Sequence, residues 1–226
     1  MRIGKELEVI SKYRNVGIRP PQTGSRYLSS NPASRGRLGV TCEVAPHHLV
    51  LSEDDYGYLG NFIKVNPPIR SREEVFGLWK CLKSGLIDII ATDHAPHTKD
   101  EKNLPYLKAP SGVPGVEMML PILLNTVNNG GLTIQEVVNL CCERPAEIFK
   151  VSKKGKILAG YDADLVVADM DLEKEFTEDD VVSKCGWSPY TGSSFQGWPV
   201  MTIVNGEIVF RDGRVACKAG GVEVGF

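Results

Sequence analysis

The chain has 226 residues, of which 42% are hydrophobic and 24% charged, and its formal net charge is −2. This size and composition are typical of a globular protein with one sizeable core. The near-neutral charge argues against nucleic-acid binding, which needs a basic surface, and the apolar stretches are too short or too interrupted to span a membrane.

Residues 1–38 form the first predicted region. They hold eight Lys or Arg against two Glu, and Ser, Pro, Gly and Asn crowd residues 19–39. Such a composition is typical of irregular or disordered chain. From residue 39 the sequence GVTCEVA alternates and is rich in β-branched residues, which predicts a strand.

A helix and a second strand follow. Ser71 can cap the free amides of a helix and Glu74 can reach back to it, and apolar side chains then recur at helical spacing to about Ser84. Gly85 ends this helix, and LIDIIATD is an apolar run that ends in polar residues, as in a parallel strand buried on both faces. The order predicts a βαβ unit.

Thr133 and Glu136 form a second capping box, which predicts a helix from 134 to about 142 that ends at Pro145, and Pro145 can itself start a further turn toward Phe149. After residue 150 only strands are predicted, and the pair Asn205-Gly206 lies between two alternating runs as the turn of a hairpin. We therefore divide the chain into an irregular segment (1–38), an α/β region (39–150) and a β-sandwich-type tail (151–226).

The six cysteines show no C-x-x-C spacing, and Cys141 and Cys142 are adjacent within a predicted helix. That pattern fits neither a zinc ribbon nor a small disulfide scaffold. We expect reduced thiols, packed as small buried hydrophobic side chains, in a cytoplasmic protein.

The most informative motif is ATDHAPHT at 91–98, directly after the second predicted strand. Polar residues at the carboxyl ends of parallel strands are where an α/β barrel builds its active site. Asp93 there can ligate a metal and take a proton from metal-bound water, whose pKa falls to about 7 beside Zn²⁺. The ring of His97 could lie over a bound substrate. In the alternative, Asp93 caps the next turn, and His94 and His97 are polar residues without a role in binding.

Three further motifs contain candidate residues. In TCEVAPHHL the adjacent histidines point in roughly opposite directions, so at most one faces the site, and we expect Glu43 and His48 to orient a ligand or water. In KVNPPIR two prolines fix the loop that presents the amide of Asn66. Ser111 and Gly112 lie in the Gly/Pro loop APSGVPG, which could offer backbone groups to a ligand. Each segment could instead be a simple turn or connection.

Seven segments in order resemble the dihydroorotase family of the amidohydrolase superfamily: TCEVAPHHL, KVNPPIR, ATDHAPHT, the DEK that follows, APSGVPGVE, KGKILAGYDADLVV and SKCGWSPYTG. The resemblance extends from about Gly39 to Val215 and covers only the C-terminal half of such a protein. It implies an α/β fold, part of a (β/α)8 TIM barrel made of its C-terminal strands and helices, followed by part of a small β-sandwich domain. It also implies reversible hydrolysis of dihydroorotate to N-carbamoyl-aspartate, in pyrimidine biosynthesis.

The resemblance also implies residue roles. Asp93 matches a metal-ligating aspartate that also transfers the proton between the attacking hydroxide and the leaving nitrogen. Asn66 and His97 match residues that hold the ring and carboxylate of dihydroorotate, and Ser111 and Gly112 match a loop whose backbone contacts the substrate amide. The residues after Gly155 match the β-sandwich and would carry no chemistry.

The chain departs from the family at the metal. The family's binuclear zinc centre uses an H-x-H pair, a bridging carboxylated lysine or aspartate and two further histidines, whereas this chain has four histidines and no H-x-H. One carboxylate cannot replace the three or four protein ligands that zinc needs, so we expect neither tight zinc binding nor catalysis by the chain alone. The recognisable motifs account for about two of eight barrel strands, which predicts exposed strand edges and a tendency to aggregate.

Three hypotheses follow. The chain is an enzyme half that needs a missing N-terminal half, from a truncated or misread reading frame or a split enzyme; or it is a non-catalytic dihydroorotase-like scaffold subunit; or it is a fragment of a hydantoinase or allantoinase. The expected partners are dihydroorotate and either the missing half or a second copy in a homo-oligomer, with no nucleic acid and no membrane.

Overall fold

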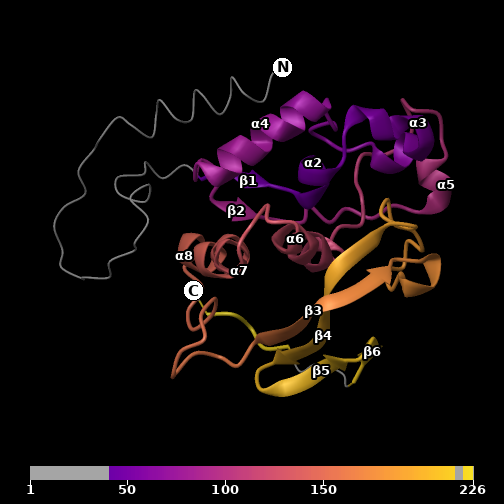
Figure 1. Ribbon diagram of the computed structural model, residues 1–226. Helices are drawn as coiled ribbons and strands as arrows, with labels where there is room; N and C mark the ends of the chain where they lie inside the picture. The colour runs from indigo at the N-terminus through magenta and orange to yellow at the C-terminus, as the bar shows by residue number, and fades with distance from the viewer. Residues whose placement is uncertain (1–40, 217–220, 226) are drawn as a thin grey trace.

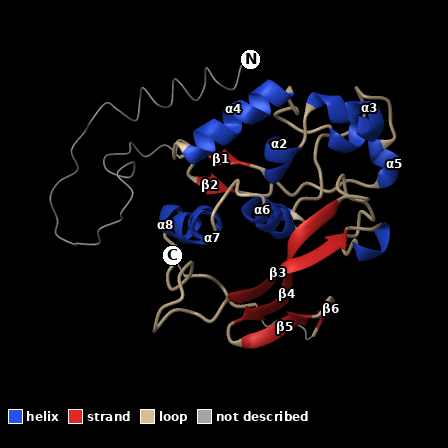
Figure 2. Ribbon diagram, in the orientation of Figure 1, coloured by secondary structure: helices blue, strands red, loops and turns tan. Residues whose placement is uncertain are grey.

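The computed structural model describes residues 41–216 and 221–225. The predicted irregular segment 1–38, and the start of the first predicted strand, lie outside the described residues. Helices gather around two short strands in one part of the molecule, and an antiparallel sheet forms another (Figure 2). The protein is therefore α/β, as the sequence predicts.

The predicted βαβ unit is confirmed. Strands β1 (Glu43–Val44) and β2 (Ile89–Ile90) pair in parallel, and helix α4 (Arg72–Lys83) lies between them in the chain. The Ser71 side chain accepts the Glu74 N–H at the start of α4, which satisfies one of the free amides there. Both strands are only two residues long, so most of this region is helix and loop.

Short helices and turns follow each strand (Figure 1). They are α2 (Pro46–Val50), η2 (Glu53–Asp55), α3 (Tyr56–Leu59) and η3 (Gly60–Ile63) after β1, and α5 (Lys99–Lys102) and α6 (Met119–Asn128) after β2. Within residues 41–216 and 221–225, every helix is too short or too polar to span a bilayer.

The further turn predicted from Pro145 toward Phe149 is confirmed, although no break separates it from the preceding helix. Helix α7 (Ile134–Val138), with the expected capping box of Thr133 and Glu136, continues through a π-helical turn, η4 (Asn139–Glu143), into α8 (Arg144–Ile148). Pro145 lies in the first turn of α8, a position at which helices tolerate proline. The feature that the sequence did not predict is the π-helical turn before it.

The C-terminal part is a four-stranded antiparallel sheet in the order β3-β4-β5-β6. Its elements are β3 (Leu165–Glu175), β4 (Ser194–Val204), β5 (Glu207–Arg211) and β6 (Arg214–Val215), with η5 (Glu178–Asp180) after β3. Asn205 and Gly206 form the predicted hairpin turn with φ of 50° and 85°. Positive φ at both positions is what this type of turn requires, which explains the residue choice.

Two apolar clusters hold these parts together. The first cluster lies under β1, β2 and α4 and consists of Val44, Leu49, Leu78, Leu82, Ile87, Ile90, Leu123, Leu132, Val137 and Leu140. The second cluster joins the loops after the strands to the C-terminal part and consists of Leu51, Ile63, Val65, Ile69, Val113, Met118, Ile122, Phe176, Trp187 and Tyr190. The C-terminal residues thus pack directly against the segments that carry the motifs.

No two of the five described cysteines form a disulfide with each other. They are less buried than expected, however, since Cys142 is exposed and the others are partly buried. Burial raises the pKa of Cys141 to about 12, so this thiol stays protonated and unreactive at neutral pH.

Candidate functional site

The motifs after the two parallel strands converge at the carboxyl ends of β1 and β2. His48 lies in α2, directly after β1, and Asp93 lies three residues after the end of β2. Burial lowers the pKa of His48, and the carboxylate of Asp93 is close enough to oppose that shift. A parallel pair brings the ends of its strands to one edge, which is why segments 45 residues apart meet here.

Asp93 is exposed and adopts a left-handed backbone conformation, with φ of 47°. Aspartate tolerates this region better than most residues, and such conformations concentrate at binding sites. The N-cap of the next helix, α5, is Thr98, in a capping box with Glu101, so Asp93 is not used to cap that helix.

Hydrogen bonds fix the tautomers of three histidines. Carbonyl oxygens only accept, so His97 Nε2, 3.2 Å from Ser111 O, and His48 Nε2, 2.9 Å from Pro67 O, must both carry protons. His94 Nδ1 instead accepts the N–H groups of Gly115 and Val116, which leaves the proton of the neutral ring on Nε2. Each ring therefore ties one motif loop to another.

His47 is turned into the protein and is only 1% exposed. Burial and the neighbouring His48 lower its pKa to about 3, so the ring is neutral at physiological pH. Its Nε2 has no partner among the residues that the structure describes. The prediction that the two rings point in roughly opposite directions is wrong, because both residues lie in helix α2 and their ring centroids are only 4.3 Å apart. Of the pair, His48 is the one that bonds the loop of Asn66, through Pro67 O.

The structure places the remaining predicted residues unequally. Asn66 is exposed and precedes a cis peptide bond to Pro67. Glu43 is exposed at the start of β1, on the opposite side of the strand from buried Val44, and is not brought against Asp93 by any contact between described residues.

Gly112 is required by space. Its φ is 142°, and a Cβ at this position would lie 2.4 Å from Ala95 O and 3.2 Å from the ring of His97. Its N–H already donates to Lys64 O at 2.9 Å. Of the two residues predicted to contact a ligand through this loop, Gly112 already uses its N–H within the protein. Ser111, which is exposed beside His97, is the one left to contact a ligand.

Sequence reasoning missed two buried residues next to the site. Lys102 is 0% exposed and Trp187 is 3% exposed. The Nε1–H of Trp187 donates to His97 O at 2.7 Å, across 90 positions in the sequence. Both residues lie in segments that carry the family resemblance, DEK and SKCGWSPYTG, but nothing in the sequence assigned either of them a role. Their contacts with the site loops appear only in the three-dimensional structure.

The described residues do not supply a zinc site by themselves. They contain no group of three His, Cys, Asp or Glu side chains that could hold a metal ion, whereas zinc sites use three or four such ligands. Asp93 would therefore need metal ligands in addition to those that the described residues bring beside it.

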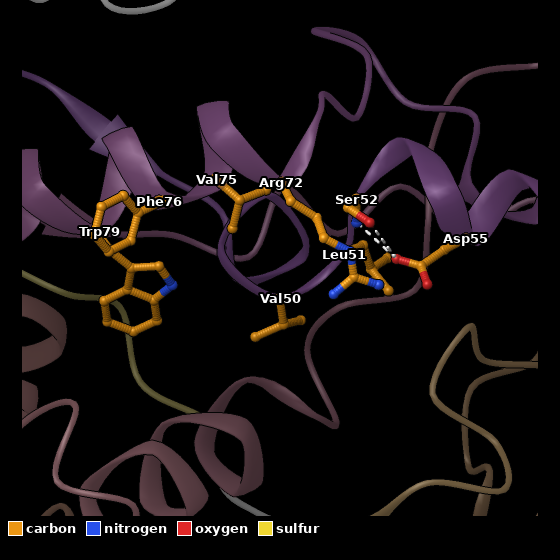
Figure 3. A pocket seen from close by; sticks show the side chains of 8 residues that line it. All are labelled: Val50, Leu51, Ser52, Asp55, Arg72, Val75, Phe76 and Trp79. Atoms are coloured by element: carbon orange, nitrogen blue, oxygen red, sulfur yellow. Dashed lines mark hydrogen bonds between the residues drawn. The ribbon is translucent and has the colours of Figure 1, made fainter.

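An open groove between α2 and α4 lies apart from the motifs. Its lining includes Val50, Phe76 and Trp79, and its volume is about 460 Å³ (Figure 3). The one carboxylate in it, on Asp55, accepts the Ser52 N–H, as the dashed lines mark. None of the predicted site residues lines this groove, so the candidate site is the set of loops at the strand ends.

Comparison with known proteins places this geometry in a family. The sequence profile of the amidohydrolase family matches residues 7–209. The chain belongs to the amidohydrolase family. The match begins at residue 7, so the pattern of the family extends into the N-terminal segment that the motifs alone left outside it.

The predicted resemblance to dihydroorotases is confirmed. The chain is 45% identical over 182 residues to a dihydroorotase from Halobacterium salinarum, covering 80% of this chain and 43% of that protein. It is 42% identical over 180 residues to a dihydroorotase from Bacillus cytotoxicus, covering 79% of this chain and 42% of that protein. This amidohydrolase chain therefore spans less than half the length of these curated relatives.

Solved structures of hydantoinases share the fold. The L-hydantoinase of Arthrobacter aurescens aligns with a TM-score of 0.76 and 36% identity over 79% of this chain and 41% of that chain. A D-hydantoinase from Thermus sp. aligns with a TM-score of 0.74 and 25% identity over 79% of this chain and 41% of that chain.

Proposed function

We propose that the chain is the substrate-binding part of a dihydroorotase-like cyclic amide hydrolase, which opens dihydroorotate reversibly to N-carbamoyl-aspartate in pyrimidine biosynthesis. The observation that carries this proposal is the convergence of Asp93, His48 and the His97–Ser111 contact at the ends of β1 and β2. The identity of 41–45% to dihydroorotases over about four fifths of the chain supports the same substrate class.

In this proposal Asn66, His97 and Ser111 bind the ring and carboxylate of dihydroorotate. His97 holds Ser111 through its Nε2–H, so Nδ1 is the ring atom left to face a ligand or Glu101, whose carboxylate lies 3.9 Å away. Gly112 contributes the space that lets the loop approach Ala95 and His97. Glu43 and His48 would orient neighbouring groups.

The proposed fold is the C-terminal part of a (β/α)8 barrel followed by part of a β-sandwich, with domain boundaries near residues 38 and 150. Parallel β1 and β2 with α4 between them support the barrel, and the antiparallel β3–β6 sheet supports the sandwich. The binuclear zinc centre of the family would draw one ligand, Asp93, from this chain and the rest from elsewhere. The isolated chain would then be inactive, and the completed enzyme cytoplasmic.

A complementation experiment tests the proposal. The chain is mixed with a separately produced N-terminal half of a dihydroorotase, and zinc content and turnover of dihydroorotate are measured. Gain of both, and their loss with Asp93→Asn, would support the proposal. An assembled complex that binds zinc but leaves dihydroorotate intact would refute it.

Hydantoin hydrolysis is the second candidate, because hydantoinases supply the structural matches with 36% identity. A panel of dihydroorotate, hydantoin and allantoin on the same complex separates the two. Preference for hydantoin by tenfold or more, about 1.4 kcal/mol in transition-state binding, would favour the second candidate.

A further inference from the structure

Lys102 is an unusual residue for the interior of a protein. Its side chain is 0% exposed, although a lysine is almost never fully buried without partners. The Nζ donates to three backbone oxygens, at 3.2 Å to Lys64, 3.0 Å to Pro110 and 2.9 Å to Gly112. All three N–H donors of the ammonium group can therefore be satisfied within the protein.

Lys64 bonds the same loop from a different motif. Its Nζ donates to Tyr106 O and Ala109 O, both at 2.6 Å, and its own carbonyl accepts the Gly112 N–H at 2.9 Å. The segment from 106 to 112 is thus held by two lysine side chains from different motifs, Lys64 at 106 and 109 and Lys102 at 110 and 112. The two ammonium groups donate four charge-assisted hydrogen bonds to carbonyls of this loop, in addition to the bond from Lys102 to Lys64 O. These bonds fix a loop that has no regular secondary structure.

Trp187 reaches the same place from the C-terminal part. Its ring lies 5.8 Å from Lys102 Nζ and packs edge-on against Phe62, with ring centroids 4.9 Å apart. Its Nε1–H holds the carbonyl of His97. The β-rich tail, to which the family resemblance assigns no chemistry, therefore contacts the backbone of a proposed substrate-binding residue.

We propose that Lys102 and Trp187 are positioning residues that fix His97 against Ser111 and Gly112 in the geometry that binds the ligand. The contact to be fixed is the hydrogen bond between His97 and Ser111 O. Lys102 bonds the carbonyl of Gly112, the residue after Ser111, and Trp187 bonds the carbonyl of His97. The identity of the ligand rests on the proposed function, whereas the positioning can be measured in the chain without any ligand.

Stability alone does not explain a buried ammonium group. Burial and the charge of Lys64 lower the pKa of Lys102 to about 8, although the three carbonyls oppose that shift because they bind the protonated form. A well-packed apolar side chain of similar volume is often as stabilising as a buried charge. A test of the proposal must therefore measure the structure of the loop around His97, because the free energy of unfolding would not distinguish the two roles.

The first test replaces Lys102 by Met and uses Lys99→Met as its control. Lys99 lies on the same helix, α5, but its ammonium group makes an exposed ion pair with Glu178 at 3.4 Å and bonds no carbonyl of the loop among the described residues. Hydrogen exchange of the Gly112 N–H and the ring ¹⁵N shifts of His97 are measured by NMR in the full chain. In Lys102→Met we expect protection of Gly112 to fall about tenfold, the loss of roughly one net hydrogen bond, with the His97 Nε2 signal shifted.

In Lys99→Met both signals should match the wild type. Wild-type protection of Gly112 and unchanged His97 signals in a folded Lys102→Met variant would overturn the role of Lys102.

The second test keeps the inference falsifiable if Lys102→Met does not fold. Trp187→Phe removes the bond to His97 O, and its matched control is Trp79→Phe, because Trp79 Nε1 donates in the same way to Leu49 O at 2.8 Å beside the first cluster. Only Trp187→Phe should move the His97 ring signals. Equal His97 spectra in the two variants would overturn the role of Trp187.

In the complemented enzyme, Lys102→Met should raise KM for dihydroorotate about tenfold and change kcat less, because ligand binding is what the loop serves. A complex that never turns over dihydroorotate would count against the proposed function only. The NMR comparison would still decide whether the two residues position His97.

Discussion

The two apolar clusters are built by different means. In the first cluster, side chains from strands and from faces of α4, α6 and α7 meet at regular spacing. The second cluster combines loop residues and residues of the C-terminal part with Ile63 of η3 and Ile122 of α6, and long-range hydrogen bonds from Lys102 and Trp187 to carbonyls hold the loops beside it. The first cluster therefore stabilises the strands and helices. The second cluster positions the loops, which are the segments that can bind a ligand.

The largest expected effect comes from a cavity in each cluster. Leu123, 1% exposed, belongs to the first cluster, and Ile63, 0% exposed, to the second. Replacing either by Ala should lower the free energy of unfolding by about 3 kcal/mol, measured by urea denaturation. Only Ile63→Ala should also shift the NMR signals of His97. A shift of equal size in Leu123→Ala would remove the distinction between the clusters.

Gly112→Ala should be nearly as costly, at about 3 kcal/mol, because it adds a clash with Ala95 O to an unfavourable φ. Gly60→Ala is the control, since φ there is 53° but no atom lies within 4 Å of the added Cβ. It should cost only about 1 kcal/mol for the left-handed conformation. Equal losses in thermal or urea unfolding would mean that the close approach of the loop to Ala95 is not real.

Acid should weaken the protein through His47, in α2 beside the first cluster. Its pKa is about 3 in the folded protein against 6.5 ordinarily, so between these pH values the unfolded chain binds more protons. The free energy of unfolding therefore falls as pH drops through that window, by about 2 kcal/mol at pH 5 relative to pH 7.5. In His47→Leu the free energy of unfolding, measured with urea, should fall about 2 kcal/mol less between pH 7.5 and pH 5 than it does in the wild type. An equal fall in the two proteins would show that His47 is not the titrating group.

The sequence predicted the first cluster better than the second. Ser71, Thr133 and the apolar periodicity located α4 and α7, and Asn205-Gly206 located the hairpin, because each signal lies within a few residues of the element it specifies. The further turn at Pro145 was predicted for the same reason, but the π-helical turn before it was not. A widened turn keeps nearly the same apolar pattern as an α-helix, so local patterns do not reveal it.

The candidate site was predicted only in part for the same reason. Asp93, His48 and His97 follow predicted strand ends, so sequence alone could bring them to one edge. Lys102 and Trp187 act through carbonyl groups 8 to 90 positions away, and a backbone carbonyl carries no residue-specific signal.

The smallest expected effect has opposite signs in the two regions. Gly77 lies in α4, and an added Cβ there meets no atom within 4 Å, so Gly77→Ala should raise the free energy of unfolding by about 0.8 kcal/mol through helix propensity. Gly115, in the loop that bonds His94, would place its Cβ 2.8 Å from Thr92 O, a backbone atom that cannot move without the loop. Gly115→Ala should therefore lower the free energy of unfolding by about 1 kcal/mol or more. Paired urea titrations measure both, and a gain in both variants would mean that the loops at the strand ends are as tolerant as the helix.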